Sequence, residues 1–423
     1  MLLPTLLTDL LYAGKERNAQ VFVEESNPAM ADLLQGYGEA VFRKAGLGGT
    51  IRVSPRREEV LRDAACVLYA GDCQAASRFF QDREALGSDQ EDDPGLSDQA
   101  RVNGGLGGLM HALRAGNEAL NLCDSMDRFC PEALVINLGQ PIARTTAMVL
   151  SRGYRCFGLG RTPLKGANGL DTYGKQLQIQ PENLRATVAG LPGFAFLLEI
   201  RDGETDLTGK LTRAAEQGEL GKLTARWLGW WGAIPVGDVT DHAEFLPAQE
   251  DYLPEERPEF GETVEKRKER ILYMNTVREQ GASSREGMMA QLLLLSKAPP
   301  VRPMRLALAL LREETASLPA VVRRNGENLP QLAPEAIIEA ELRLEAGVEK
   351  PLELHLPVAL AEIMAEVDCA NRLAARAATG DREALREYVE TDPALAGLDR
   401  LYCMDVVEAL IRMHQDVLGR ISG

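Results

Sequence analysis

Short apolar segments alternate with helical segments through the first third of this chain, and this alternation limits the folds it can adopt. The apolar segments are "AQVFVEES", "TIRVSP", "ACVLYAG" and "ALVINLG", and residues with helical spacing separate them. Strands that alternate with helices predict β-α-β units, which assemble into parallel sheets with right-handed crossovers. We therefore predict an α/β fold with a Rossmann-like N-terminal domain.

The predicted domain departs from a dinucleotide-binding domain at its start. Such a domain opens with a strand and a Gly-rich turn, and the turn holds a phosphate at the N-terminus of the first helix. Here the leucine spacing predicts a helix over residues 2–13. We expect a Rossmann-like domain that lacks its first strand and its Gly-rich loop.

The character of the sequence changes near Thr187. The later residues contain all three tryptophans, a strongly charged helical stretch over 251–285, a hairpin pattern in "AIIEAELRLEAGVEKPLEL" and a series of C-terminal amphipathic helices. We assign residues 1–186 to an NAD-binding-type domain. Residues 187–423 are assigned to an α+β domain for substrate binding and oligomerisation.

Charge and cysteine content restrict the partners and the compartment. The formal net charge is −16 over 423 residues, and a surface of this sign repels nucleic-acid phosphates and anionic membranes. No apolar run is long enough to span a bilayer. The seven cysteines form no C-x-x-C pair and most lie in apolar runs, which suits a reducing cytoplasm. A small anionic ligand in a local basic pocket remains compatible with this charge.

Polar residues and glycines follow several predicted strands, where open α/β sheets bind their ligands. Glu25 ends "VFVEE" at the position of a ribose-binding acid, and Gly71 ends "ACVLYAG". Asn137 and Gln140 follow "ALVI" and can hydrogen-bond a sugar or a nicotinamide ribose. Read more simply, Glu25 is an exposed loop acid, and the two amides belong to a polar turn before Pro141.

Three other features could carry chemistry. The "NGGLGG" turn, residues 103–108, could donate backbone N–H groups to an anion, or could simply lead into a helix. His242 stands among Asp238, Asp241 and Glu244, a set that suits metal binding or acid–base work, and equally a capped helix start. Arg161 follows Gly158-Leu159-Gly160 and could stabilise developing negative charge, bind a carboxylate or phosphate, or form a salt bridge.

Taken in order, the segments of the chain resemble the NAD-dependent glycoside hydrolases of family 4, the α-galactosidase and 6-phospho-glucosidase group. The resemblance covers nearly the whole length. The segments that carry it are "PTLLTDLL", "VFVEESNP", "ARVNGGLGGLMHALR", "CPEALVINLGQPIARTTAMVL", "AGLPGFAFLLEIRDGETDL", "GAIPVGDVTDHAEFLP" and "RNGENLPQLAPEAIIEAEL".

The resemblance implies an unusual glycosidase reaction. In this family NAD⁺ oxidises the sugar C3 hydroxyl, a base removes the acidified C2 proton, and the glycosidic bond is cleaved by elimination. A divalent metal, typically Mn²⁺, polarises the sugar oxygens. Relatives are dimers or tetramers, so we expect a homodimer or homotetramer that takes a glycoside or a sugar acid.

This chain departs from the family at its metal ligands. The family cysteine after "GL" matches Gly160, and the histidine of "GLNHF" matches Gly193, which follows Pro192. Gln140 replaces the asparagine of "TNP", and Val102 replaces a glutamate before the Gly-Gly turn. Because glycine has no side chain that can bind a metal, we expect NAD as a cofactor, weakened by the missing loop, and no Mn²⁺.

We therefore expect a family-4-like protein that hydrolyses O-glycosyl bonds by NAD-dependent oxidation and elimination. Glu25, Gly71 and Asn137 are assigned to the cofactor. Asn137, Gln140, Arg161 and His242 are assigned to the substrate, with Arg161 and His242 catalytic. Two alternatives remain open: a non-catalytic relative that binds a sugar or a partner, and an NAD-dependent oxidoreductase that acts on a hydroxy acid with His242 as its base.

Overall fold

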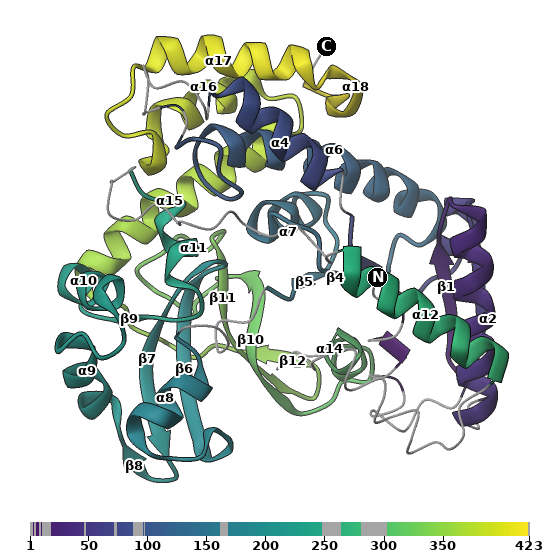
Figure 1. Cartoon of the computed structure of the whole chain (residues 1–423), viewed down its shortest axis with the longest axis horizontal. Coiled ribbons are helices and arrows are strands. Elements are labelled where there is room, and N and C mark those ends of the chain that lie inside the picture. Colours follow the sequence, from purple (N-terminus) through teal and green to yellow (C-terminus); the bar gives the residue numbers. More distant parts are fainter. Residues whose placement is uncertain are drawn as a thin grey trace. The chain divides into compact units, whose positions relative to one another are not determined.

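The structure, a computed structural model, describes most of the chain (Figure 1). The described residues are 3, 6–7, 10, 18–45, 48–71, 74–87, 96, 98–160, 168–247, 264–280 and 303–421. The chain divides into two compact units. The first consists of Met1–Val67, Leu122–Leu134 and Glu259–Glu314, and the second of Leu68–Asn121, Val135–Pro258 and Thr315–Gly423. The predicted domain boundary between residues 186 and 187 falls inside a strand of the second unit, and that division stays a prediction.

A two-stranded parallel sheet with helices packed on it forms the first unit. Strands β1 (Gln20–Glu24) and β2 (Thr50–Ser54) pair in parallel with Gln20 opposite Thr50. The helices are α2 (Pro28–Ala45), α3 (Arg57–Leu61), α12 (Val264–Gln280) and α14 (Pro303–Leu311). Of the leucines whose spacing predicts the first helix, Leu3, Leu7 and Leu10 lie in one core with residues of α2 and α12. Leu6 is half-buried, and the remaining residues of the predicted helix lie outside the described part.

A ten-stranded mixed sheet dominates the second unit. Its main path runs β3-β4-β5-β10-β11-β6-β7-β8, with β12 paired to β11 and β9 paired to β7. The strands are β3 (Cys66–Tyr69), β4 (Leu134–Asn137), β5 (Cys156–Gly158), β6 (Leu184–Leu191), β7 (Phe194–Asp202), β8 (Thr205–Asp206), β9 (Ile234–Pro235), β10 (Ala316–Arg324), β11 (Ile337–Glu345) and β12 (Val348–Lys350). β4 and β5 are parallel, whereas the pairs from β5–β10 onward are antiparallel.

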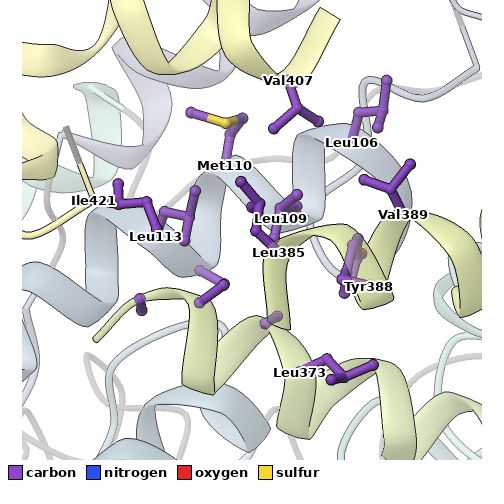
Figure 2. Packing of buried hydrophobic residues seen from close by; sticks show 14 of the residues in the cluster. Leu106, Leu109, Met110, Leu113, Leu373, Leu385, Tyr388, Val389, Val407 and Ile421 are labelled. Atoms are coloured by element: carbon purple, nitrogen blue, oxygen red, sulfur yellow. The ribbon is translucent and has the colours of Figure 1, made fainter. Parts of the chain in front are cut away.

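The helices of this unit are α4 (Ala75–Ala85), α6 (Gly105–Phe129), α7 (Ile142–Ser151), α8 (Leu170–Leu177), α9 (Thr208–Glu216), α10 (Lys222–Trp231), α11 (Val239–Ala243), α15 (Val358–Ala377), α16 (Arg382–Thr391), α17 (Arg400–Met413) and α18 (Gln415–Leu418). Some of them lie against the sheet, whereas α4, α16, α17 and α18 gather with other helices at one end of it (Figure 1). Figure 2 shows the largest core of the unit, where Leu109 and Leu113 of α6 meet Leu385 and Tyr388 of α16. Fully burying each such leucine contributes about 1.5–3 kcal/mol, so α6 is fixed by packing along much of its length.

The predicted fold class is confirmed. The first-third strands form as expected, and the parallel pairs β1–β2 and β4–β5 carry the Rossmann-like character. The predicted hairpin is β11–β12. One of the predicted C-terminal amphipathic helices is α16, at whose start the Asp381 carboxylate accepts from the N–H groups of Glu383 and Ala384. A search of the described helices finds no segment with the length and apolar character needed to cross a bilayer.

Candidate functional site

The carboxyl ends of β4 and β5 are neighbours in the sheet of the second unit. Asn137 stands opposite Gly158, and the Leu159 N–H donates to the Asn137 carbonyl at 3.0 Å. The chain then leaves β5 through Gly160. Arg161, predicted to bind substrate and act in catalysis, lies outside the described residues. The described part of this edge is therefore built from backbone, one asparagine and glycines.

The Asn137 side chain is held in a buried network at the start of α7. Its Nδ2 donates to the hydroxyl oxygens of Thr145 and Thr146 at 2.8 and 2.9 Å, and its Oδ1 accepts from the Gly139 N–H at 2.9 Å. Both amide protons are thus used inside the protein, and the side chain has no exposed surface. Asn137 fixes the strand end, and its predicted role in ligand binding stays a prediction.

Gln140 lies three residues further along the same turn. It is half-buried, its Oε1 accepts from the Ile142 N–H at 3.2 Å, and its peptide bond to Pro141 is cis. Of the two predicted amides at this strand end, Gln140 is the one that reaches toward the surface.

A buried glutamate, Glu339, lies between Gly160 and Gly193, the two glycines predicted to stand where the family has metal ligands. It sits on β11 with Gly190 of β6 as its cross-strand partner, and only 3% of its surface is exposed. A Cβ built on Gly160 would lie 2.6 Å from Glu339 Oε1, and the Gly193 N–H donates a hydrogen bond to the carboxyl. The side chain therefore bridges the β5 end and the β6–β7 turn.

Burial changes the acidity of this carboxyl. Removal from water raises the pKa of Glu339 from 4.5 to about 7, and the Gly193 hydrogen bond acts in the opposite direction. Among the described residues Oε1 has no hydrogen-bond partner, which is costly for a buried polar atom. Near neutral pH this group can hold or release a proton.

Backbone geometry explains why glycine stands at both positions. Gly193 has φ +78° in the turn between β6 and β7, a conformation that side-chain-bearing residues rarely adopt. At Gly160 the obstacle is space, because a Cβ would lie 2.6 Å from Glu339 Oε1 and the carboxyl would have to shift to admit a side chain. Glu339, Gly160 and Gly193 are therefore mutually adapted, and we call them the Glu339 site.

The predicted anion-binding turn before α6 is occupied by acids of the chain itself. Glu244 accepts from the N–H groups of Val102 and Asn103 at 3.4 and 2.9 Å, and from Asn103 Nδ2 at 2.6 Å. Asp392 accepts from the Gly105 N–H at 2.9 Å. Burial, helped by the nearby charge of Asp241, raises the pKa of Glu244 to about 7. These carboxyls already occupy positions where an external anion would bind.

His242 is packed among buried aromatic side chains of strand β7. Its ring lies 5.4 Å from that of Phe194 and 5.2 Å from that of Phe196, centre to centre. Nδ1 lies 3.1 Å from the Asp238 carbonyl and Nε2 lies 3.0 Å from the Ala195 carbonyl. Burial lowers the pKa of His242. Both ring nitrogens thus face backbone oxygens, and its predicted catalytic role stays a prediction.

Two predicted cofactor residues remain. Glu25, in the first unit, follows β1; its N–H donates to the Ser54 carbonyl at 3.2 Å and its Oε1 accepts from the Asn27 N–H at 2.9 Å. The carboxylate is half-exposed and held in a fixed direction. Gly71, in the second unit, follows β3, and a Cβ there would lie 2.4 Å from the Tyr69 hydroxyl, so close packing explains this glycine.

Sequence reasoning missed Glu339 and undervalued Glu244. The signal for Glu339 was present in "AIIEAEL", because an acid inside a run of apolar residues is costly to bury unless it has a role. Its neighbours became visible only in three dimensions, since Gly160, Gly193 and Glu339 lie far apart in the sequence.

Comparison with known proteins agrees with this architecture. Residues 18–165 match the sequence model described as family 4 glycosyl hydrolase. An α-galactosidase of Bacillus subtilis is 27% identical over 114 residues, 27% of this chain and 26% of that protein. An α-glucosidase of Erwinia rhapontici is 25% identical over 199 residues, 46% of this chain and 42% of that protein. The chain thus aligns with less than half the length of either relative.

A solved structure extends the likeness to the whole fold. It is a 6-phospho-α-glucosidase from gut microorganisms in complex with NAD and Mn²⁺, superposed with a TM-score of 0.74 over 98% of this chain and 95% of the other, at 13% identity. The chain is similar to the family 4 glycosyl hydrolases over residues 18–165, and to this solved structure in its fold. The resemblance predicted from the order of segments is thereby confirmed. Within the described residues, no three His, Cys, Asp or Glu side chains gather in a group that could hold a metal ion.

Proposed function

We propose that this chain hydrolyses O-glycosyl bonds by NAD-dependent oxidation and elimination, as a family-4-like protein that works without a metal at Gly160 and Gly193. The observation that carries the proposal is the family-4 match over residues 18–165, which contains the predicted cofactor-binding strand ends. The solved relative bound to NAD has the same fold, which makes NAD the first cofactor to test.

Glu25 supports the cofactor part of this proposal. A carboxylate at a strand end, with one oxygen oriented by a backbone N–H, suits the hydroxyl groups of a ribose. When bound, NAD⁺ supplies an acceptor for a hydride. Within this account Glu25 orients the cofactor, and Gly71 and Asn137 stay assigned to cofactor binding.

The two glycines support the metal-free part. Binding Mn²⁺ needs oxygen, nitrogen or sulfur donors, and neither Gly160 nor Gly193 offers a side chain. Among the described residues Glu339 is the acid that contacts these two glycines, and a single carboxyl is a poor site for a divalent ion. The donor set does not fit the metal, so no step of the proposed reaction passes through one.

The proposed substrate is a small glycoside or a sugar acid. Gln140, Asn137 and His242 are proposed to contribute to the pocket, and Arg161 is proposed to stabilise developing negative charge. From the family resemblance and the net charge of −16 we further propose a cytoplasmic homodimer or homotetramer with no nucleic-acid or membrane partner.

A specific observation favours one alternative, a non-catalytic relative. The donors of the Asn137 amide and of the turn before α6 are satisfied inside the protein, by Thr145, Thr146, Glu244 and Asp392. A protein that no longer binds a cofactor can keep such a closed network. Under this alternative the chain binds a sugar or a partner subunit without turnover.

Calorimetric titration with NAD⁺ separates these functions. We expect saturable binding of one NAD⁺ per chain, and a Glu25→Ala variant should weaken it by about tenfold or more, since hydrogen bonds to a charged group contribute about 1.5–3 kcal/mol. Nitrophenyl α- and β-glycosides, with and without a 6-phosphate, then test for cleavage. Binding without cleavage would favour the non-catalytic relative, and oxidation of a free hydroxy acid without cleavage would favour an oxidoreductase.

A Glu24→Ala variant is the matched control. Glu24 is the neighbouring exposed acid on β1 and pairs with Arg57 at 2.9 Å. Its loss should leave NAD⁺ affinity unchanged. Equal loss of affinity in both variants would show that general surface charge, and not the oriented Glu25 carboxylate, accounts for the effect.

A further inference from the structure

Helix α17 carries a group of exposed apolar side chains. Leu401 is 80% exposed, Tyr402 49% and Met413 40%, whereas the other exposed large apolar side chains of the described chain lie singly on other elements. Single apolar residues on a surface are ordinary, but a group of them on one element marks an interaction surface. The group on α17 therefore indicates a face that another molecule covers.

Helical spacing arranges most of this group in a line. Four apolar residues of α17 follow one another at intervals of four, three and four, and they are Tyr402, Val406, Ala409 and Met413. This spacing places them along one side of the helix, and we call them the α17 stripe. Ala409 is exposed and Val406 is half-buried. Val407, in contrast, points into the core that α17 shares with α6 and α16 (Figure 2). The stripe is thus additional to the residues that fix α17 in its unit.

Two charged residues border the stripe. Asp405 precedes Val406 and Arg412 precedes Met413, so both lie along the same border. Both are exposed, and neither forms an ion pair with a described residue. About 10 Å of helix rise separates them, which is too far for them to pair with each other. The border therefore offers one negative and one positive charge to a partner.

A second copy of α17 that runs in the opposite direction matches both features. In such a pair Tyr402 lies opposite Met413 of the second copy, and Val406 lies opposite its Ala409. Because a two-fold rotation exchanges the helices, the charged border meets the same border of the second copy. Asp405 then lies beside Arg412 of the second copy, and Arg412 beside its Asp405. The face is self-complementary in apolar pattern and in charge, as an interface between identical subunits requires.

We propose that α17 packs against α17 of a second copy of this chain as a two-fold antiparallel helix pair. This inference rests on the oligomer part of the proposed function and names the face that forms it. Val406 and Ala409, at the centre of the stripe, are small enough to let the helices approach closely, and Tyr402 and Met413 supply larger contacts at each end. Leu401 lies outside the charged border and shields the two ion pairs from water.

Sedimentation equilibrium of the full chain at micromolar concentrations tests the contact. We expect the wild type to self-associate. Ala409→Glu places a charge near the two-fold axis and should weaken this association by about 100-fold or more. The control is Val358→Glu, which places the same charge at a 76% exposed apolar residue on α15 and should leave the association unchanged. Thermal melting followed by circular dichroism shows that each variant is folded.

A charge exchange tests the antiparallel direction. Asp405→Arg and Arg412→Asp should each weaken association by about tenfold or more, because each creates two like-charge pairs across the two-fold axis. The double variant, Asp405→Arg with Arg412→Asp, should recover most of the wild-type affinity. Since the two residues cannot pair within one chain, such recovery can arise only between copies.

The outcomes separate this face from the oligomer itself. If Ala409→Glu associates like the wild type, or if the double variant is no tighter than the single ones, this face is overturned and the proposed oligomer stands. A folded wild type that stays monomeric overturns both, and a different partner then covers the stripe. Neither result bears on glycoside hydrolysis, which is measured separately.

Discussion

Replacing Glu339 with glutamine should stabilise the protein at alkaline pH. In the unfolded chain this carboxyl has its ordinary pKa of 4.5, whereas burial raises the pKa of Glu339 to about 7 in the folded state. Between these values the folded protein keeps a proton that the unfolded chain has lost, so stability falls as the pH rises through this window. A pKa difference of this size between the folded and unfolded states corresponds to about 3 kcal/mol in the free energy of unfolding. Glutamine resembles the protonated acid and removes this loss.

The measurement is the free energy of unfolding in urea at pH 5 and at pH 8. Glu339→Gln should lie near the wild type at pH 5 and above it at pH 8, by roughly 2–4 kcal/mol. Glu244 contributes a similar slope because its pKa is also raised to about 7, so the variant keeps part of the pH dependence. Glu345→Gln, which changes an exposed acid on the same strand, should leave the free energy of unfolding at both pH values unchanged. A variant whose stability falls with pH as steeply as the wild type would mean that Glu339 stays ionised in the folded protein.

Removing Asp82 should have the largest effect on stability of any single substitution considered. Asp82 of α4 and Arg114 of α6 form a two-point ion pair, with Nη1–Oδ1 3.2 Å and Nη2–Oδ2 2.8 Å, and each side chain is only 1% exposed. His414 Nε2 lies 2.5 Å from Asp82 Oδ1. Asp82→Ala leaves a buried guanidinium without its carboxylate, which costs about 3–5 kcal/mol.

A double variant separates pairing from packing. Asp82→Ala with Arg114→Met removes both charges and should recover most of the loss, because the stranded cation is what destabilises the single variant. Glu408→Ala, which breaks the more exposed pair with Arg382, should cost at most about 1 kcal/mol. Urea unfolding of the four proteins gives the comparison. If Asp82→Ala lowers the free energy of unfolding no more than Glu408→Ala does, water must reach the Arg114 guanidinium.

Local patterns explain which parts of the fold could be predicted. The strands of the first third and helix α6 follow from short-range periodicity, and the start of α16 follows from the Asp381 cap. Strands β6 and β10 were not predicted. Their sequences, "LRATVAGL" and "ASLPAVVRR", contain Gly190 and Pro319, which weaken a strand pattern, and pairing with β7 and β11 supplies what the local sequence lacks.

The site was predictable only in part. The family resemblance predicts that Gly160 and Gly193 stand where the family has metal ligands, and this stays a prediction. It could not show what fills the space between them, because Glu339 reaches it from a strand that is distant in the sequence. The His242 cluster illustrates the reverse case. Its residues are close in sequence, yet His242 faces backbone carbonyls while Glu244 binds the turn before α6.

Titration of the wild-type protein with Mn²⁺, followed by the electron paramagnetic resonance signal of the free ion, tests the central claim most directly. The protein is kept with NAD⁺ and glucose 6-phosphate, so that every ligand of a family-4 reaction is available. If the chain works without a metal at Gly160 and Gly193, Mn²⁺ should stay free until weak surface binding begins, and Glu339→Gln should give the same curve. Tight binding of one Mn²⁺ per chain that Glu339→Gln abolishes would contradict the account, since Glu339 would then be a metal ligand.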